Sequence, residues 1–397
     1  MKLFRVLPVL FLIATVGTAT ARDEVHPDRM VSRLAFGSCV MQDRPQPFWE
    51  HVNTYAPDVW LWLGDTVYAD SPRPQADTEE ERARIVLDRM PELYRQQRAE
   101  PGYAALRERA FVAGIWDDHD YGKNDAGADW IGREEAQWHF WDFYDEPAQS
   151  ARRGLPGTYR AIRFGPPGRT VQLILLDTRF FRSPLTRLDE SAEHDWLLGQ
   201  PGRYEVNNDP AATVLGEAQW QWLEQVLREP ADLRVLVSSI QIVADDHRWE
   251  KWGNFPAERR RLFRLLRATG ANGVVILSGD RHTGELSLLD PARESHPDFT
   301  APDYPLYDLT ASALTQSRPT TFEAQQEGRW ANPVSHRHEI NRHRIGSVVR
   351  YNHYGTLTIA WEHAAGPQLT LELVADNGTP MLRQQVDLTA LRTPVRN

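Results

Sequence analysis

The strongest constraint on the fold is a series of short apolar runs, each of which ends in polar or acidic residues. The runs are rich in Val, Ile, Leu and Trp and cover residues 34–37, 59–64, 111–116, 171–177, 235–240 and 274–279. Runs of this length and composition are typical of strands that are buried on both faces of a sheet. Amphipathic helical patterns lie between them, at 77–98, 215–227 and 259–267. Strands that alternate with helices predict a layered α/β core.

The pattern changes after residue 300, where short strands follow one another without helices. These strands are predicted at 347–349, 355–361, 369–374 and 381–386. Asn377-Gly378 is a strong signal for a hairpin between the last two. We expect the antiparallel part, 300–397, to complete the core formed by 31–290, which carries the motifs described below. No change in composition marks a linker, so one domain is predicted for 22–397.

The N-terminus has the features of a secretory signal peptide. Lys2 and Arg5 precede the apolar run Val6 to Val16, and the small residues Ala19-Thr20-Ala21 follow it. The run is too short to cross a bilayer comfortably, although a retained membrane anchor is the alternative. We therefore expect residues 1–21 to be removed, leaving a periplasmic or secreted protein without a membrane span.

The charge balance excludes some partners. The chain of 397 residues has 45 Lys and Arg against 55 Asp and Glu, a net charge of −10. Nucleic-acid binders present a basic face, so a nucleic-acid partner is not expected. Binding of a polyanion would require metal ions or a local cluster of arginines. The single cysteine, Cys39, cannot form an internal disulfide. The oligomeric state is left open.

Acidic and metal-capable residues follow the predicted buried strands repeatedly. They are Cys39, Asp65, Tyr68, the run Asp117 to Asp120, Asn124, Asp177, Asp280 and His282. Each of them alone has an ordinary structural explanation, such as a turn or a solvated surface. Together, around one sheet edge, they would cost several kcal/mol in repulsion and desolvation unless cations neutralised them. Thiolate and phenolate donors favour an ion such as ferric iron, whereas carboxylate and amide oxygens suit calcium or another hard divalent ion.

Four motifs in this order resemble those of a known family. They are Phe36-Gly37-Ser38-Cys39, Gly64-Asp65-Thr66-Val67-Tyr68, Trp116-Asp117-Asp118-His119-Asp120 with Asn124, and Gly279-Asp280-Arg281-His282. The set is similar to the PhoD-type alkaline phosphatases of the calcineurin-like metallophosphoesterase superfamily, over roughly residues 31–290. The resemblance implies a four-layer α/β/β/α sandwich that hydrolyses phosphate esters at a metal cluster on the strand ends.

The resemblance also implies roles for the metal-capable residues. Asp65 would bridge two metals. The iron, Fe(3+), would be held by Cys39, Tyr68 and His282. The second position, commonly Ca(2+) with other divalent metals possible, would be held by Asn124 and Asp280. Two adjacent cations would attract an anionic ester and lower the pKa of a bound water, whose hydroxide attacks phosphorus.

Four further residues are candidates for catalysis. Arg179 and Arg281 could stabilise the charge of the transition state, although exposed arginines are common. His119 could be the general acid for the leaving group or could orient Asp118 or Asp120. Asp118 could instead hold a metal ligand in place. The segment after the fifth strand could bring Asp246 or His247 to the pocket, or could be a surface loop. Six tryptophans lie near the motif strands, of which most should pack in the core and one or two could line the pocket rim: Trp49, Trp60, Trp62, Trp116, Trp249 and Trp252.

Other functions remain open at this point. The main alternative is a phosphodiesterase with phospholipase-D-like activity, whose substrate would be a lipid head group rather than a small phosphate ester. A non-catalytic, metal-stabilised binding protein is a different class. A hydrolase with Ser38 or Cys39 as the nucleophile and His119 as its base is disfavoured, because neighbouring carboxylates would raise the pKa of the nucleophile. The founding family members have a paired-arginine leader and an extra N-terminal domain. Residues 1–21 contain no Arg-Arg pair, and the first motif strand is expected soon after them, so we expect export by the general secretory route.

Overall fold

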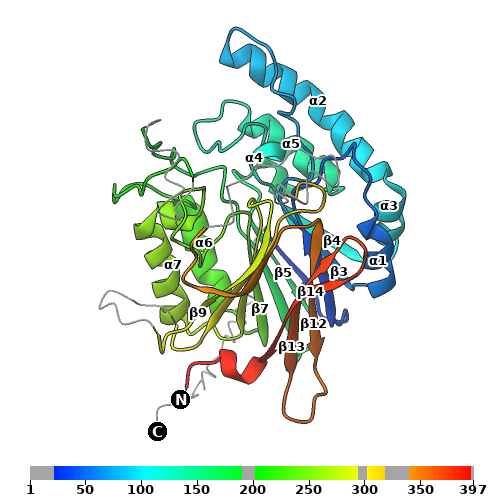
Figure 1. Ribbon diagram of the computed structural model, residues 1–397, viewed down its shortest axis with the longest axis vertical. Coiled ribbons are helices and arrows are strands. Elements are labelled where there is room, and N and C mark those ends of the chain that lie inside the picture. Colours follow the sequence, from blue (N-terminus) through cyan, green and yellow to red (C-terminus); the bar gives the residue numbers. More distant parts are fainter. Residues whose placement is uncertain (1–21, 190–201, 294–301, 318–338, 395–397) are drawn as a thin grey trace, which may run out of the picture.

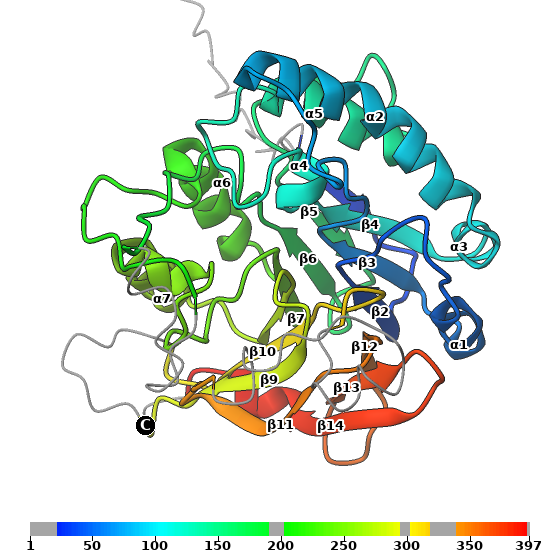
Figure 2. The ribbon, with the colours of Figure 1, turned by 45° about the horizontal axis from the view of Figure 1, so that its top comes forward.

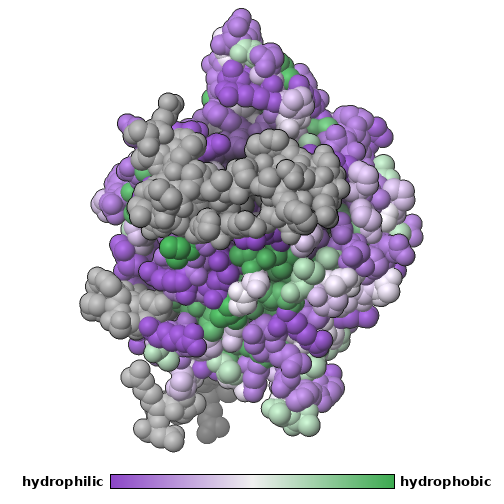
Figure 3. All heavy atoms as spheres, in the orientation of Figure 1, coloured by the Kyte–Doolittle hydropathy of each residue, from purple (hydrophilic) through white to green (hydrophobic). Residues whose placement is uncertain are grey.

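A computed structural model describes residues 22–189, 202–293, 302–317 and 339–394. The predicted signal peptide, 1–21, lies outside these residues. Within them, no helix is both long enough and apolar enough to cross a membrane. Hydrophilic side chains dominate the face shown in Figure 3, as expected for a chain in which 25% of the residues are charged.

The larger of two sheets has eight strands and is mostly parallel at its centre. Its order is β1 (Asp23–His26), β5 (Arg160–Phe164), β6 (Val171–Leu175), β7 (Leu233–Ser238), β8 (Val274–Ser278), β10 (Leu306–Ala311), β9 (Gly284–Leu289) and β11 (Arg344–Val349). Strands β6, β7, β8 and β10 are parallel neighbours, whereas β9 pairs antiparallel with both β10 and β11. The carboxyl ends of the parallel strands therefore meet at one edge.

The second sheet has six strands and joins the two ends of the chain. Its order is β14 (Pro380–Asp387), β13 (Gln368–Ala375), β12 (His353–Ala360), β2 (Arg33–Gly37), β3 (Val59–Leu63) and β4 (Phe111–Ile115). Strands β2, β3 and β4 are parallel, and β12 pairs antiparallel with β2. Gly355 lies opposite Phe36, where a Cβ atom would come within 2.1 Å of the Phe36 ring. The C-terminal strands thus extend the sheet that carries the first three motifs.

Helices cover the outer face of each sheet (Figures 1 and 2). Those beside β2, β3 and β4 are α1 (Phe48–Tyr55), α2 (Glu79–Ala99), α3 (Pro101–Arg107), α4 (Asp118–Tyr121) and α5 (Arg133–Phe143), and those beside the larger sheet are α6 (Gly216–Arg228) and α7 (Pro256–Thr269). Short 3-10 helices span Ala151–Gly154, Trp252–Asn254 and Leu388–Leu391.

The alternation of side chains along β3 shows how the layers are held together. Leu61 and Leu63 pack in the apolar core between the two sheets, whereas Trp60 and Trp62 pack in a second core under the helices. All four are fully buried, so this strand is apolar along its whole length, as a strand covered on both faces should be. The predicted four-layer α/β/β/α sandwich is confirmed.

The structure differs from the sequence prediction in two respects. The motif strands do not share one sheet edge, because β2, β3 and β4 belong to one sheet and β6, β7 and β8 to the other. Strands β1, β5, β9 and β10 were not predicted. Strand β10 escapes detection because it buries Asp308 and Thr310, whose side chains bond to Ser278 and to backbone N–H groups of the loop after β7.

Candidate active site

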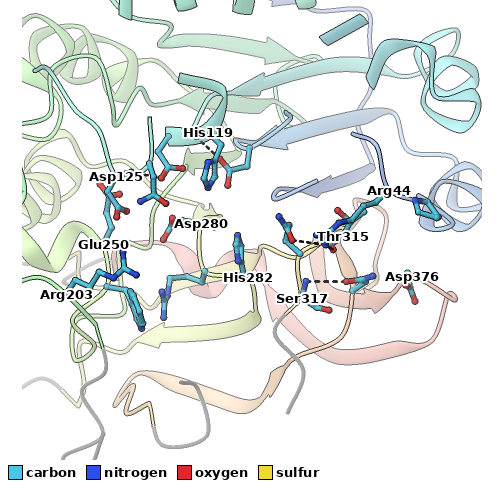
Figure 4. A pocket seen from close by; sticks show the side chains of 18 of the residues that line it. Arg44, His119, Asp125, Arg203, Glu250, Asp280, His282, Thr315, Ser317 and Asp376 are labelled. Atoms are coloured by element: carbon cyan, nitrogen blue, oxygen red, sulfur yellow. Dashed lines mark hydrogen bonds between the residues drawn. The ribbon is translucent and has the colours of Figure 1, made fainter. Parts of the chain in front are cut away.

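A cavity of about 1060 Å³ opens where the carboxyl ends of the parallel strands of both sheets meet (Figure 4). Asp65 reaches it from the loop after β3, and Asp118 and His119 reach it from the start of α4, which follows β4. Asp280 and His282 reach it from the loop after β8. Residues from two sheets therefore line one cavity.

The backbone at the strand ends has an uncommon conformation. Cys39, Asp65, Asp280 and His282 have φ angles of 61°, 50°, 69° and 55°, in the left-handed region that residues other than glycine rarely adopt. Gly64, at φ 98°, lies so close to the β4 loop that a Cβ atom would come within 2.4 Å of Asp117 Cβ. Strained backbone of this kind concentrates at functional sites. Four of the predicted metal ligands are held in this way.

Three of the predicted iron ligands form one group, and the fourth contacts it. Cys39, Asp65 and His282 offer ligand atoms that lie within 4.8 Å of one another. The Tyr68 hydroxyl donates to Asp65 Oδ2 at 3.1 Å and lies 3.0 Å from His282 Nε2. The Cys39 thiol donates to the same Asp65 oxygen at 3.4 Å. Sulfur, phenol, imidazole and carboxylate are thus brought together around one point.

A second group consists of carboxylates. Asp117, Asp118 and Asp280 also offer oxygens within 4.8 Å of one another. Asp117 Oδ2 and Asp118 Oδ1 are buried and have no hydrogen-bond partner. Buried carboxylate oxygens without donors are costly, and a hard cation is the partner that such a group fits. Asp117 was not predicted as a ligand, and its position directly after β4 is the signal that could have found it.

Burial explains why these donors need positive charge. It raises the pKa of the Cys39 thiol and of the Tyr68 phenol well above their ordinary values, and nearby Asp65 raises both further. Burial also raises the pKa values of Asp65 and Asp280, and neighbouring carboxylates add to the effect. Each of these shifts disfavours the anionic form of the group unless a cation is bound. Both groups of donors therefore fit metal ions chemically.

His119 is held in one orientation. Its Nδ1 lies 2.6 Å from Asp70 Oδ1, and its ring stacks on Tyr68 with centroids 4.0 Å apart. His119 also forms a potential ligand group with Asp65 and Asp118. Since Asp70 occupies Nδ1, Nε2 is the nitrogen available to the cavity. Asp70 was not predicted, and its only signal in the sequence is that it follows Tyr68 by two residues.

The two predicted arginines occupy different places. Arg179 is completely buried and does not line the cavity. It donates to Asp117 Oδ1 at 2.6 Å and to Glu250 Oε2 at 2.7 Å, so its position suits holding these carboxylates rather than contacting a substrate. Arg281 does line the cavity, and one of its nitrogens bonds both oxygens of Glu339 at 2.8 and 2.9 Å.

The remaining metal candidate, Asn124, is exposed and lines the cavity, and its backbone N–H donates to Asp70 Oδ2 at 2.9 Å.

Asp120 holds two loops together. Its carboxylate accepts from the N–H groups of Asp65, Thr66 and Asp117. It therefore ties the loop after β3 to the loop after β4.

Other candidates lie away from the cavity surface. His247 is buried, with Nε2 2.9 Å from Gln241 Oε1, and Asp246 accepts from the N–H of Arg342 at 2.7 Å. From the same segment, Trp249 and Glu250 line the cavity instead. Ser38 and Cys39 are fully buried and are not among the residues that line it. Their positions do not suit a nucleophile for an external substrate.

Comparisons with known proteins give a consistent result. The family model described as PhoD-like phosphatase matches residues 34–365. Alkaline phosphatase D of Bacillus subtilis (strain 168) is 24% identical over 283 residues, which cover 64% of this chain and 46% of that protein. The chain thus spans about half the length of this curated relative. A solved structure, titled Structure of PhoD, superposes with a TM-score of 0.58 at 18% identity, covering 91% of this chain and 71% of that one. At this identity the likeness shows a shared fold.

Proposed function

Because the chain belongs to the PhoD-like phosphatase family, we propose that it is a metal-dependent hydrolase of phosphate esters. The observation that carries the proposal is the convergence of two donor groups, one with sulfur and imidazole and one with carboxylates alone. Members of both groups line a single cavity. Such an arrangement is expensive to maintain unless cations occupy it.

The donor chemistry suggests which ions bind. Cys39, Tyr68 and His282 would hold ferric iron, and Asp280 with Asn124 would hold calcium or another hard divalent ion. Asp65 lies between the two groups, and Asp117 and Asp118 add oxygens to the second. Bound cations would neutralise the charged oxygens of the ester and would lower the pKa of water beside it.

The protein's own side chains bind the ester and move the proton. Arg281 extends into the cavity, where its charge would attract the ester oxygens. As water adds to phosphorus, the bond to the leaving oxygen breaks and that oxygen takes a proton from Nε2 of His119. The attacking water releases one proton to solvent, and His119 regains its proton from solvent after the products leave. Asp70 holds His119 in the orientation that this transfer needs.

The test is elemental analysis of the purified protein, with turnover of nitrophenyl phosphate measured before chelation, after it, and after metal return. We expect bound metal and activity that is lost and restored together. Asp65→Asn should lower both metal content and activity. The control Asp129→Asn, at an exposed position, should change neither. If metal stabilises the protein but no phosphate ester is hydrolysed, the protein is a non-catalytic, metal-stabilised binding protein instead.

A diester substrate is the second candidate, favoured by the size of the cavity. Figure 4 places Arg44 and Arg203 at opposite ends, with Asp280 and His282 between them. A phosphodiester has a substituent on each side of phosphorus, and the cavity extends on both sides of these ligands. Comparing turnover of nitrophenyl phosphate with that of bis(nitrophenyl) phosphate decides between the two.

We also propose that the enzyme is exported, on the signal-peptide features of residues 1–21. Arg22, the next residue, donates to the carbonyls of Pro156, Gly157 and Tyr159. N-terminal sequencing of the mature protein should therefore begin at Arg22, and an intact Met1 in the exported protein would contradict the proposal.

A further inference from the structure

A second cavity, of about 490 Å³, adjoins the first. His119, Asn124 and Arg203 line both cavities, so the two communicate at the proposed general acid. Apart from Asp70, which holds His119, the remaining residues of this second cavity have no part in the metal groups or the proposed reaction. We call this second cavity the side cavity.

The side cavity is rich in cations that the protein does not neutralise. Arg73, Arg187 and Arg203 are exposed, and none of them has a carboxylate within ion-pair distance in the described part of the chain. Two more cations, Arg82 and Lys123, pair with the same carboxylate, Glu79. The other carboxylate of the lining, Asp70, pairs with His119. Five cations thus face two engaged carboxylates, in a chain whose net charge is −10.

The backbone that carries the unpaired arginines is held in place. Arg187 pairs with Tyr204 in a β-bridge, and the N–H of Leu188 donates to the carbonyl of Arg203 at 2.8 Å. These bonds fix Arg187 and Arg203 on neighbouring strands of backbone. The loop with Arg73 is tied to α2, because Arg89 donates to the carbonyl of Pro72 at 3.1 Å. The arginines therefore do not depend on an ion to bring them together.

An aromatic side chain forms part of the floor. Trp130 is almost completely buried and lines the side cavity, and Lys123 Nζ lies 5.6 Å from its ring centroid. A ligand here would meet an apolar floor and a cationic rim, which suits a short carbon skeleton with an anionic end.

We propose that the side cavity binds a second phosphate, carried by the leaving group of the substrate. The inference rests on the proposed function, because it takes His119 as the donor to the leaving oxygen. A leaving group protonated at His119 lies at the junction, and the side cavity is the space beyond it. Guanidinium groups match phosphate oxygens in geometry and charge, and unpaired ones lose no internal partner on binding. The substrate class is therefore a phosphate ester with a second phosphate on its alcohol part.

The experiment compares alkanediol bisphosphates with alkyl monophosphates of the same chain length on the full, metal-loaded enzyme. We expect kcat/KM to be at least about tenfold higher for the bisphosphate of best length, because each charged hydrogen bond contributes appreciably. The preference should diminish as salt is raised, since exposed charges are screened. In the double variant Arg73→Gln/Arg187→Gln the ratio of the two kcat/KM values should fall to near one.

Two further variants separate the side cavity from general effects of charge. Arg264→Gln removes an exposed arginine on α7, outside the side cavity, and should keep the ratio. Arg203→Gln should lower kcat/KM for both substrates, because Arg203 lines both cavities.

Binding measurements keep the inference testable without turnover. Calorimetric titration of Asp65→Asn with each compound should show tighter binding of the bisphosphate, and the added Arg73→Gln/Arg187→Gln changes should abolish the difference. Equal affinities, or equal kcat/KM values with monophosphates still hydrolysed, overturn the side-cavity inference and leave the proposed function intact. Preferential binding of the bisphosphate without turnover of any ester would support the side-cavity inference and contradict the proposed function.

Discussion

The phenol oxygen of Tyr68 lies 3.0 Å from Nε2 of His282, although 214 residues separate them along the chain. Tyr68 follows β3 of the six-stranded sheet, and His282 follows β8 of the eight-stranded sheet. This contact therefore exists only when the two sheets pack together. It joins the halves of the proposed iron site, and the first prediction concerns it.

If Tyr68 and His282 hold ferric iron, the tyrosinate should give the purified protein a visible charge-transfer colour. Tyr68→Phe should lose this absorption, because it removes the oxygen that gives rise to it. Absorption spectra recorded together with the iron content check the prediction. The matched control is Tyr351→Phe, which changes an exposed tyrosine rather than the buried one that contacts Asp65 and His282, and should keep the colour. Iron present in full with no visible band in the unaltered protein would contradict the assignment of Tyr68.

Asp70 is expected to act through His119. In Asp70→Asn the imidazole loses its charged partner at Nδ1, so protonation of poor leaving groups should suffer. Alkyl phosphates need an acid and nitrophenyl phosphate barely does. We expect kcat for alkyl phosphates to fall toward the loss seen in His119→Ala, of about 10²-fold or more, with a much smaller change for nitrophenyl phosphate.

Metal content measured on the same samples is the control for this pair of variants. If iron and the second metal are retained and both substrates slow equally, His119 is not the acid. A loss of metal in His119→Ala would show instead that His119 is a ligand.

Arg179 bonds two buried carboxylates, those of Asp117 and Glu250. Arg179→Met leaves both without their cation, and the removal of one partner from a buried ion pair costs about 3–5 kcal/mol of unfolding free energy. Arg383→Met, which removes an exposed arginine 3.6 Å from the partly buried Glu372, should cost less than about 1 kcal/mol. Denaturant unfolding of the two variants checks the difference. Equal losses would show that the buried network contributes nothing special to stability.

The lowered pKa of Asp245 predicts how the stability of the fold depends on pH. Burial alone would raise its pKa, but nearby His343, with Nε2 3.6 Å from Asp245 Oδ1, and the charges of Arg259 and Arg342 lower it to about 2. A carboxyl group with a depressed pKa stabilises the fold above its unfolded pKa near 3.9, and this contribution is lost as the pH falls through the folded value. The shift corresponds to roughly 2–3 kcal/mol.

Unfolding free energies measured between pH 6 and pH 2 test this. Asp245→Asn should be less stable than the unaltered chain at pH 6, and the difference should shrink toward pH 2. Asp129→Asn, at an exposed position, should follow the unaltered chain throughout. A gap between Asp245→Asn and the unaltered chain that stays constant with pH would refute the role of this carboxylate.

Much of the fold follows from local sequence. The apolar run over β3 matches the observed strand, Val59–Leu63, to within one residue, because a strand covered on both faces must be apolar throughout. The amphipathic pattern at 215–227 likewise marks α6, whose Trp220, Leu223 and Val226 pack in the core. The hairpin at Asn377-Gly378 joins β13 to β14 as expected. Strand β10 was missed because its buried polar residues interrupt the apolar signal.

Local sequence could not determine the roles of Arg179 and Asp70. An exposed arginine that binds substrate and a buried arginine that holds two carboxylates have the same local sequence signature, and only burial by α4, β6 and their loops distinguishes them. The sequence likewise does not show that Asp70 is the partner of His119. Their distance depends on how the loop after β3, which carries Asp70, folds against α4.

The sequence by itself determined which residues end the strands and which chemical groups they carry, since both depend on composition and spacing along the chain. The tertiary structure alone decided that these ends come from two sheets, that Asp117 joins Asp118 and Asp280, and that three arginines gather beside His119. The physical reason is that hydrophobic burial between the sheets brings together donors hundreds of residues apart, and neither proximity nor desolvation is encoded at any single position.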